Sequence, residues 1–478
     1  MYTLMIIIFI LGYLAIALEH NIHIDKGASA LLTGVLVWTV FVFGADSILG
    51  IDFSWSLTDL YANSDGFLKG LNGFLNIEKE DILASGDTVS QVTNHFIGHE
   101  LKHHVVDIAE ILFFLLGAMT IVEVIDAHDG FAVITDRINT ANKVKLIWVL
   151  SVITFFFSAA LDNLTTAIVM SALLKKLIKD RDDLWLFAGM VIVAANAGGA
   201  WSPIGDVTTI MLWIGGNITA SHIITGIFIP SLIALLVPLG ILSFTLKGEV
   251  ARPEKADGDD VRITTDGERN LVFILGVSSL LFVPIYKTVT HLPPFMGILF
   301  GLGLMWAVTE IIHKRKSIHA KSKLSVSGVI RKVDTPSVMF FLGILLAVGA
   351  LSSAGQLLDL ASWLEVKMDG NIYAINVIIG LLSSVVDNVP LVAGAMGMYD
   401  VGVYEAGMSY PVDHPFWEFL AYCAGTGGSA LIIGSAAGVA VMGILKIDFM
   451  WYMKRISLLA LSGYLAGALF YYVENTML

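Results

Sequence analysis

Long apolar runs separated by short polar loops dominate the pattern along this chain. Runs such as 105–125, 223–246 and 295–312 approach the roughly 20 residues that a helix needs to cross a bilayer. The apolar residues are continuous rather than alternating, so the pattern predicts spanning helices and not the strands of a barrel. We therefore expect an all-α polytopic membrane protein. The expected apolar segments are 2–18, 28–49, 105–125, 146–161, 184–195, 223–246, 271–286, 295–312, 337–358 and 449–472.

Two Asp-Asn pairs interrupt this apolar pattern. Asp162-Asn163 and Asp387-Asn388 each lie in an apolar run, and in both copies a serine, Ser158 or Ser383, stands four residues before the aspartate. A carboxylate at membrane depth is costly, so its usual role is functional. The alternative is that each aspartate only caps a short helix. Two such units in matching contexts predict one site assembled from two halves.

The two halves of the chain repeat the same order of features. Asp387 follows Asp162 by 225 residues, and Gly427 follows Gly198 by 229. Each Gly-Gly pair lies in a break between apolar stretches, at 196–206 and 425–435. The pattern predicts repeats at 1–246 and 270–478, joined by a charged linker at 247–269. It subdivides the repeats into helices 1–50, an external polar segment 51–104, helices 105–246 and 270–312, a basic cytoplasmic loop 313–335 and helices 336–478.

Charge predicts how the halves are oriented, because Lys and Arg in short loops stay cytoplasmic. The first Asp-Asn unit is flanked by basic residues on both sides, including Lys143 and Lys175, and the second by acidic ones, including Asp369 and Asp400. Each unit is therefore expected to be a re-entrant hairpin, entering from opposite sides. Each half then has about five spanning helices, one hairpin and one broken helix, and the halves are inverted.

The hairpin tips and breaks carry a set of oxygen-rich side chains. Backbone that leaves the helix at this depth is tolerated where it is buried in protein or lines a wet cavity. Hard cations prefer oxygen ligands, and no Lys or Arg lies in these motifs, so a small hard cation fits better than a transition metal or an anion. Burial favours the neutral carboxyl form, so proton and cation can compete for one site. Each Ser or Thr could equally bond to its own helix. The candidates are Ser158, Asp162, Asn163, Thr165, Asn196, Asp206, Thr208, Thr209, Ser383, Asp387, Asn388, Thr426, Ser429 and Ser435.

Two motifs carry a resemblance to a known family. Ser-x-x-x-Asp-Asn-x-Thr-Thr at 158–166 and Gly-Gly-x-x-Ser-Pro-Ile-Gly-Asp-x-Thr-Thr at 198–209 resemble NhaD-type sodium/proton antiporters of the ion transporter superfamily. The resemblance implies exchange of Na⁺ (and Li⁺) for H⁺ in a bacterial inner membrane, without a cofactor. It implies a homodimer in which a scaffold (1–50 and 270–312) supports core helices that move like an elevator. Na⁺ is expected at Asp162, Asn163, Asp387 and Asn388.

Alternative functions remain. Anion carriers for arsenite or dicarboxylates share the fold, although the related symporters carry Thr where Asp206 stands. His99-Glu100-Leu101-Lys102-His103 matches the H-E-x-x-H pattern of zinc metalloproteases, but that reading leaves the repeat unexplained. A pH-sensing role for His99 and His103, and a proton route through Glu110, are weaker hypotheses. The net charge of −13 gives no reason to expect nucleic-acid binding, and we expect a transporter rather than an enzyme.

Overall fold

The computed structural model describes most of the 478 residues. The described residues are 1–17, 19–63, 71–72, 74–75, 78, 80, 82, 85, 87–135, 138, 140–252, 264–385, 388–403 and 409–477. Asp387 and residues 253–263 of the 247–269 linker fall outside them, as does part of the 51–104 segment.

Helices make up nearly all of the described secondary structure. The first half contains α1 (Tyr2–Ala17), α2 (Glu19–Ile22), α3 (Lys26–Phe43), α4 (Ala45–Leu49), α5 (Leu57–Ala62), α8 (Val89–Ala127), α9 (Ala132–Thr135), α10 (Lys143–Leu161), α11 (Asn163–Leu177), α12 (Arg181–Ala200), α13 (Val207–Ile214) and α14 (Ala220–Thr245). The second half contains α15 (Asp266–Thr290), α16 (Pro294–Ile312), α17 (Ile318–Leu324), α18 (Val326–Val329), the 3₁₀ helix η2 (Ile330–Lys332), α19 (Thr335–Ser353), α20 (Gln356–Met368), α21 (Ile372–Leu382), α22 (Asn388–Met398), α23 (Pro415–Gly427), α24 (Ala436–Leu445), α25 (Phe449–Arg455) and α26 (Ser457–Met477). Two short strands, β1 (Asp400–Val401) and β2 (Ser409–Tyr410), pair in parallel.

Nine helices in the described part of the chain are long and apolar enough to cross a membrane, or ten if α24 and α25 form one bent span. This confirms the prediction of a polytopic, helical membrane protein.

Several predicted helix limits are wrong. The predicted spans 28–49 and 337–358 each divide: α3 ends at Phe43 before α4, and α19 ends at Ser353 before α20, where Gly355 adopts a φ of 79°. Helix α8 begins at Val89 rather than at 105, because Thr88 and Gln91 form a capping box that starts the helix in the polar segment. Helix α12 continues through Ala200, so the first break starts later than residue 196. The apolar run 449–472 is not one helix: it divides at Ile456, whose buried side chain packs against Gly189 of α12.

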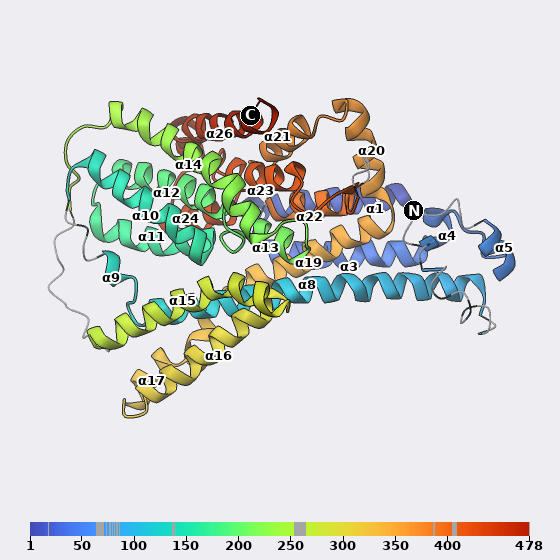
Figure 1. Ribbon diagram of the computed structural model, residues 1–478, viewed down its shortest axis with the longest axis horizontal. Coiled ribbons are helices and arrows are strands. Elements are labelled where there is room, and N and C mark those ends of the chain that lie inside the picture. The colour runs from blue at the N-terminus through green and yellow to red at the C-terminus, as the bar shows by residue number, and fades with distance from the viewer. Residues whose placement is uncertain are drawn as a thin grey trace.

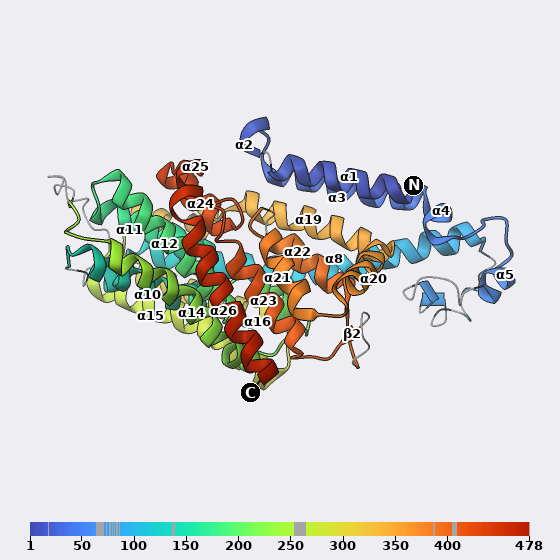
Figure 2. The same cartoon turned by 90° about the horizontal axis from the view of Figure 1, so that it is seen from above.

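Helices from the two halves pack beside one another in two groups. In one group α3 packs on α19, α8 on α16 and α19, and α15 on α16. These helices run along the lower part of Figure 1, and α1 covers α3 at the edge seen in Figure 2. In the other group α10 packs on α12, α21 on α23, and α14 on α26. The second group contains α10 and α21, the helices that lead into the two Asp-Asn units.

The same close contact occurs once in each half. Ser158 Oγ donates to Ala195 O at 2.5 Å, and Ser383 Oγ donates to Ala424 O at 2.7 Å. These bonds fasten α10 to α12 and the end of α21 to α23. Beside each bond a glycine lets the backbones touch: a Cβ on Gly427 would lie 2.1 Å from the carbonyl oxygen of Gly380. The Cβ of a residue at 198 would lie equally close to the Phe155 carbonyl.

A buried histidine pair joins the ends of α8 and α16. His128 Nε2 lies 2.7 Å from His313 Nε2, and His128 Nδ1 lies 2.7 Å from the Val124 carbonyl oxygen. Because Nδ1 of His128 must donate to that carbonyl, its Nε2 accepts from His313 when both rings are neutral. His313 Nδ1 then faces Glu268, at 3.9 Å, which is itself paired with Lys316.

We expect this pair to make the fold less stable in mild acid. Burial lowers the pKa of His128 to about 4, and burial together with Lys316 lowers the pKa of His313. The unfolded chain therefore takes up protons first as the pH falls below about 6.5, and stability is lost between about pH 6.5 and 4. Thermal unfolding in detergent at pH 7.5 and 5.0 should show a smaller drop for the double variant His128→Asn/His313→Asn than for the wild type. The exposed His103→Asn is the control; an equal drop in the double variant would contradict the assignment.

Gly427→Ala should destabilise the second-half contact. Its Cβ would meet the backbone of Gly380, which cannot move without shifting α21, and overpacking of this kind costs about 1–3 kcal/mol. Gly443→Ala is the matched control, because it lies in α24 with no atom within 4 Å of the new Cβ. A lower Tm for the first variant alone is the expected result; equal values would show that the contact relaxes freely.

Candidate functional site

The carboxylate of Asp206 is at the centre of the buried polar cluster. The chain leaves α12 after Ala200 and starts again as α13 at Val207, with Asp206 as the capping residue. Thr208 donates to Asp206 Oδ1 through its backbone N–H and its hydroxyl, both at 3.0 Å. The side chain is almost completely buried, so its negative charge depends on such donors.

Amide groups from both halves of the chain point at this carboxylate. Asn163 Nδ2 at the start of α11 donates to Asp206 Oδ2 at 2.5 Å. Asn388 Nδ2 at the start of α22 lies 3.4 Å from each carboxylate oxygen. Hydrogen bonds to an ionised acceptor are the stronger class. The two asparagines that follow the predicted aspartates thus share one partner.

Asn196 extends the cluster into the second break. Its Oδ1 accepts from Asn163 Nδ2 at 3.1 Å. Its Nδ2 lies 2.9 Å from both Ser429 Oγ and Ser435 Oγ. The first half and the second half are therefore joined by a continuous chain of side-chain hydrogen bonds.

Asp162 occupies the tip between α10 and α11 in an unusual backbone conformation. Its φ of 79° and ψ of 158° lie in a region that is essentially restricted to glycine and costs of the order of 1–3 kcal/mol. The carboxylate accepts from the Thr165 backbone N–H and hydroxyl, both at 2.8 Å. Asp162 therefore does cap α11, while its strained backbone is typical of a functional position.

Several of the candidate hydroxyls bond to backbone carbonyls. Ser158 and Ser383 form the contacts between helices described above. Thr426 Oγ1 donates to Tyr422 O in its own helix at 2.5 Å, and Thr209 Oγ1 donates to Asp206 O at 2.8 Å. These four side chains shape the site. Asp387, the second predicted aspartate, lies outside the described residues.

Two further residues support the site without having been singled out. Ser202 Oγ in the first break donates to Ala159 O of α10 at 2.5 Å, and it is the serine of the Gly-Gly-x-x-Ser-Pro motif. Tyr452 OH on α25 donates to Ser429 O at 2.8 Å. The motif could have identified Ser202, but no sequence signal links Tyr452 to the second break.

The weaker candidates on α8 have different surroundings. The side chains of His99 and His103 are 55% and 67% exposed, and Glu100 instead accepts from Ser353 Oγ at 2.9 Å. Among the described residues, they do not form one of the His, Cys, Asp and Glu groups close enough to share a metal ion. Glu110 has Asp107 and Lys287 as charged neighbours.

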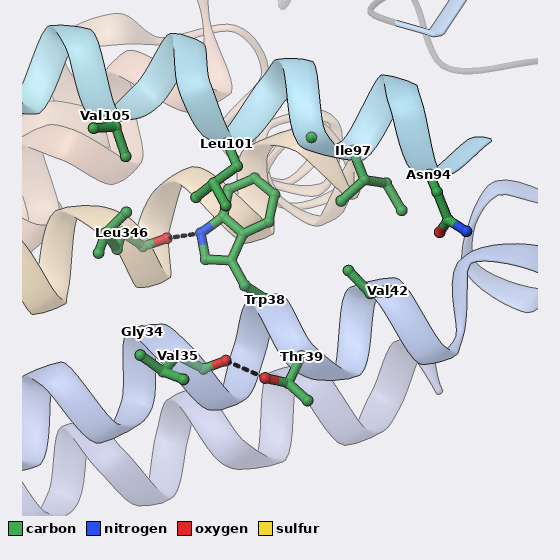
Figure 3. Close-up of a pocket in the computed structure, with 11 residues that line it drawn as sticks. Gly34, Val35, Trp38, Thr39, Val42, Asn94, Ile97, Leu101, Val105 and Leu346 are labelled. Carbon is green, nitrogen blue, oxygen red and sulfur yellow. Dashed lines mark hydrogen bonds between the residues drawn. The ribbon is translucent and has the colours of Figure 1, made fainter. Parts of the chain in front are cut away.

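A separate groove of about 560 Å³ lies between α3 and α8. Figure 3 shows its lining, in which Trp38 Nε1 donates to Leu346 O at 2.8 Å and Ile97 and Leu101 face the opening. The lining is mostly apolar and contains no charged residue. This groove does not offer the oxygen ligands of the Asp206 cluster.

Comparison with known proteins identifies a family of transporters. Residues 5–417 match the family described as citrate transporter. A protein of Arabidopsis thaliana named sodium/proton antiporter 1 is 47% identical over 379 residues, which cover 79% of this chain but 64% of the relative, so the chain spans just under two thirds of it. Sodium/proton antiporter 2 of the same plant is 45% identical over 78% of this chain and 87% of the relative. The Na⁺/H⁺ antiporter NhaD of Alkalimonas amylolytica is 30% identical over 72% of each chain.

Removal of either asparagine amide should weaken the fold by different amounts. Asn163→Ala leaves Asp206 Oδ2 and Asn196 Oδ1 without their short donor, and an unsatisfied buried polar group costs about 1–3 kcal/mol, more when it is charged. Asn388→Ala removes only two long contacts. We expect the larger drop in Tm for Asn163→Ala at neutral pH. The reverse order would contradict the bonding pattern.

Proposed function

Because the chain belongs to the NhaD-type sodium/proton antiporters, within the family described as citrate transporter, we propose that it exchanges Na⁺, and also Li⁺, for H⁺ at the Asp206 cluster. Its relatives are named as antiporters, so the chain is not an enzyme, and Na⁺ and H⁺ are cargo rather than cofactors.

The observation that carries this proposal is the convergence of both halves on one buried carboxylate. Asp206 is held by Asn163 from one half and Asn388 from the other. The amide oxygens of these side chains, together with the carboxylate, are the hard ligands that an alkali cation requires. A cation entering the cluster draws these oxygens toward itself, and a proton on the carboxylate removes the charge that attracts the cation. Competition for the same atoms couples the two ions if the unloaded site does not cross the membrane.

Asp162 supplies the second charge in this proposal. It lies next to Asn163 and is 7% exposed, so an ion reaching Asn163 passes close to both carboxylates. We also propose a role for Asp387, which the sequence pattern pairs with Asp162. Ser429 and Ser435 contribute hydroxyls through Asn196. Together these groups form a site in which one or two protons can be displaced.

The proposed architecture is an inverted repeat with two re-entrant hairpins. It is supported by the matching contacts of Ser158 and Ser383 and by the opposite charge of the hairpin flanks. The hairpins are α10–α11 and α21–α22, and the broken helices are α12–α13 and α23–α24. Inversion brings these four interruptions together near the midplane.

We further propose an elevator movement of this core against a scaffold. The packing favours a scaffold of α1, α3, α8, α15, α16 and α19, so α8 and α19 join it and the core starts later than 105 and 336. Lys287 of α15 donates to the Trp213 carbonyl oxygen at the end of α13, at 2.7 Å, and lies 4.6 Å from the Trp213 ring centroid. A moving core must release this contact.

A homodimer joined through the scaffold, in a bacterial inner membrane, completes the proposal, although the plant relatives show that the family is not confined to bacteria.

An anion carrier is the second candidate, because the matching family is described as citrate transporter. A citrate or arsenite carrier needs positive or neutral donors around its anion. The described side chains of the Asp206 cluster provide two carboxylates and no Lys or Arg, so a cation is favoured.

Ion exchange in proteoliposomes tests the proposal directly. With a trapped pH dye, Na⁺ or Li⁺ added to wild-type vesicles should dissipate an imposed proton gradient, whereas K⁺, citrate and arsenite should give no response. A response to an anion alone would replace the antiporter by the second candidate.

Asp162→Asn and Asp206→Asn should each slow exchange by at least about 100-fold, because each removes a carboxylate that binds the cation and takes up or releases the proton. Asparagine caps a helix as well as aspartate does, so the loss isolates the charge from capping. Asp448→Asn is the matched control, because Asp448 caps α25 in a polar, exposed position.

Asp162→Gly sharpens this test. Glycine accepts φ of 79° without strain, so the variant should remain folded and yet fail to exchange ions. Normal exchange in Asp162→Gly would place the ion path away from this tip.

A further inference from the structure

Three metal-ligating side chains meet where α14 and α23 begin. His222 lies in the first turn of α14, Asp413 precedes α23, and Glu418 lies in its first turn. One ligand atom from each lies within 4.8 Å of the other two. We propose that these residues bind a transition-metal dication such as Zn²⁺, at a site remote in sequence from the Asp-Asn motifs. The inference does not depend on the proposed ion exchange.

The spacing of the donor atoms suits a small metal ion. His222 Nδ1 lies 3.4 Å from Glu418 Oε1, and His222 Nε2 lies 3.9 Å from Asp413 Oδ2. Ligands on a tetrahedral zinc ion, with bonds of about 2.1 Å, lie roughly 3.4 Å from one another. The two contacts involve different ring nitrogens, so rotation of the exposed His222 ring brings one imidazole nitrogen and two carboxylate oxygens onto one ion, leaving a position for water.

Neighbouring groups already hold both carboxylates in place. Asp413 accepts from the Thr219 backbone N–H at 2.6 Å and from the Thr219 hydroxyl at 2.9 Å. Glu418 Oε2 accepts from Tyr471 OH at 3.1 Å. Hydrogen bonds of this kind orient metal ligands and raise affinity. His222 is the one ligand that stays largely exposed, at 60%, so the ion can enter from solvent.

The charge of the cluster calls for a cation. Glu418 is 93% buried, and a buried carboxylate is unfavourable unless its charge is compensated. Among the described residues, His222 is the only basic side chain that forms an ion pair with Asp413 or Glu418. A dication balances the two carboxylates. The imidazole ligand selects a transition metal over Mg²⁺ or Ca²⁺, which prefer oxygen alone.

The ligands come from different halves of the chain, so the metal would link them. His222 belongs to the helix that packs on α26, and Glu418 belongs to the helix that packs on α21. A bound ion should therefore raise the thermal stability of the protein, because it binds only the folded arrangement.

Zinc binding to the purified full-length protein in detergent tests this site. Titration with chelator-buffered Zn²⁺ should show one saturable ion per chain and a rise in Tm. His222→Ala and Glu418→Gln should each weaken binding by at least about 100-fold, since each removes a direct ligand. Tyr471→Phe removes only the orienting hydroxyl and should weaken binding about 10-fold.

The double variant His99→Ala/His103→Ala is the control. It removes two exposed histidines that lie outside the proposed site, so the zinc affinity should be unchanged. Co²⁺ in place of Zn²⁺ should give a visible absorption band that His222→Ala abolishes. Zinc binding that survives both ligand substitutions, or that is lost in the His99/His103 variant, would overturn the assignment. Absence of saturable binding in the wild type would also overturn it.

Discussion

Burial of the Asp206 charge is the constraint on which the centre of this structure depends. A carboxylate in a low-dielectric interior must be met by donors, and the chain recruits Thr208 from its own helix and Asn163 and Asn388 from elsewhere. The same hydrogen bonds that stabilise the charge also hold the two halves together. In the proposed exchange, binding of a cation or a proton at Asp206 would therefore alter the contacts between the halves.

The two halves share a local architecture but differ in charge. Asp206 and Ser435 both cap the helix after a break, with φ of −147° and −148°. Serine satisfies the same cap without a charge, so the second copy provides neutral donors where the first provides a carboxylate. Asn196 reaches across to Ser429 and Ser435, and it has glycine, Gly425, at the equivalent position in the second half. Among the described residues of the cluster, the carboxylates, Asp162 and Asp206, therefore both come from the first half.

Rigid contacts surround this polar centre. The serine bonds and glycine approaches at 158–198 and 383–427 fix α10 to α12 and the end of α21 to α23. The strained backbone of Asp162 persists because α10 and α11 are held on both sides. Fixed geometry of this kind means that ligands do not have to be assembled anew for each ion.

The amino-acid sequence by itself determined the helical membrane class, the positions of the polar interruptions and the family. These properties depend on composition and on short motifs, such as 158–166 and 198–209, that can be read along the chain. Only the tertiary structure decided which groups the polar side chains form hydrogen bonds with. Asn388 meets a carboxylate 182 residues away, and the hydroxyls of Ser158 and Ser383 bond to neighbouring helices. The helix limit at Ile456 was likewise decided by packing against Gly189, whereas the limit at Val89 follows from the local Thr88–Gln91 capping box, which the sequence carries. The hydropathy pattern depends only on residues adjacent in the sequence. Hydrogen bonds form between groups that the fold brings close together, and these can be far apart in the sequence.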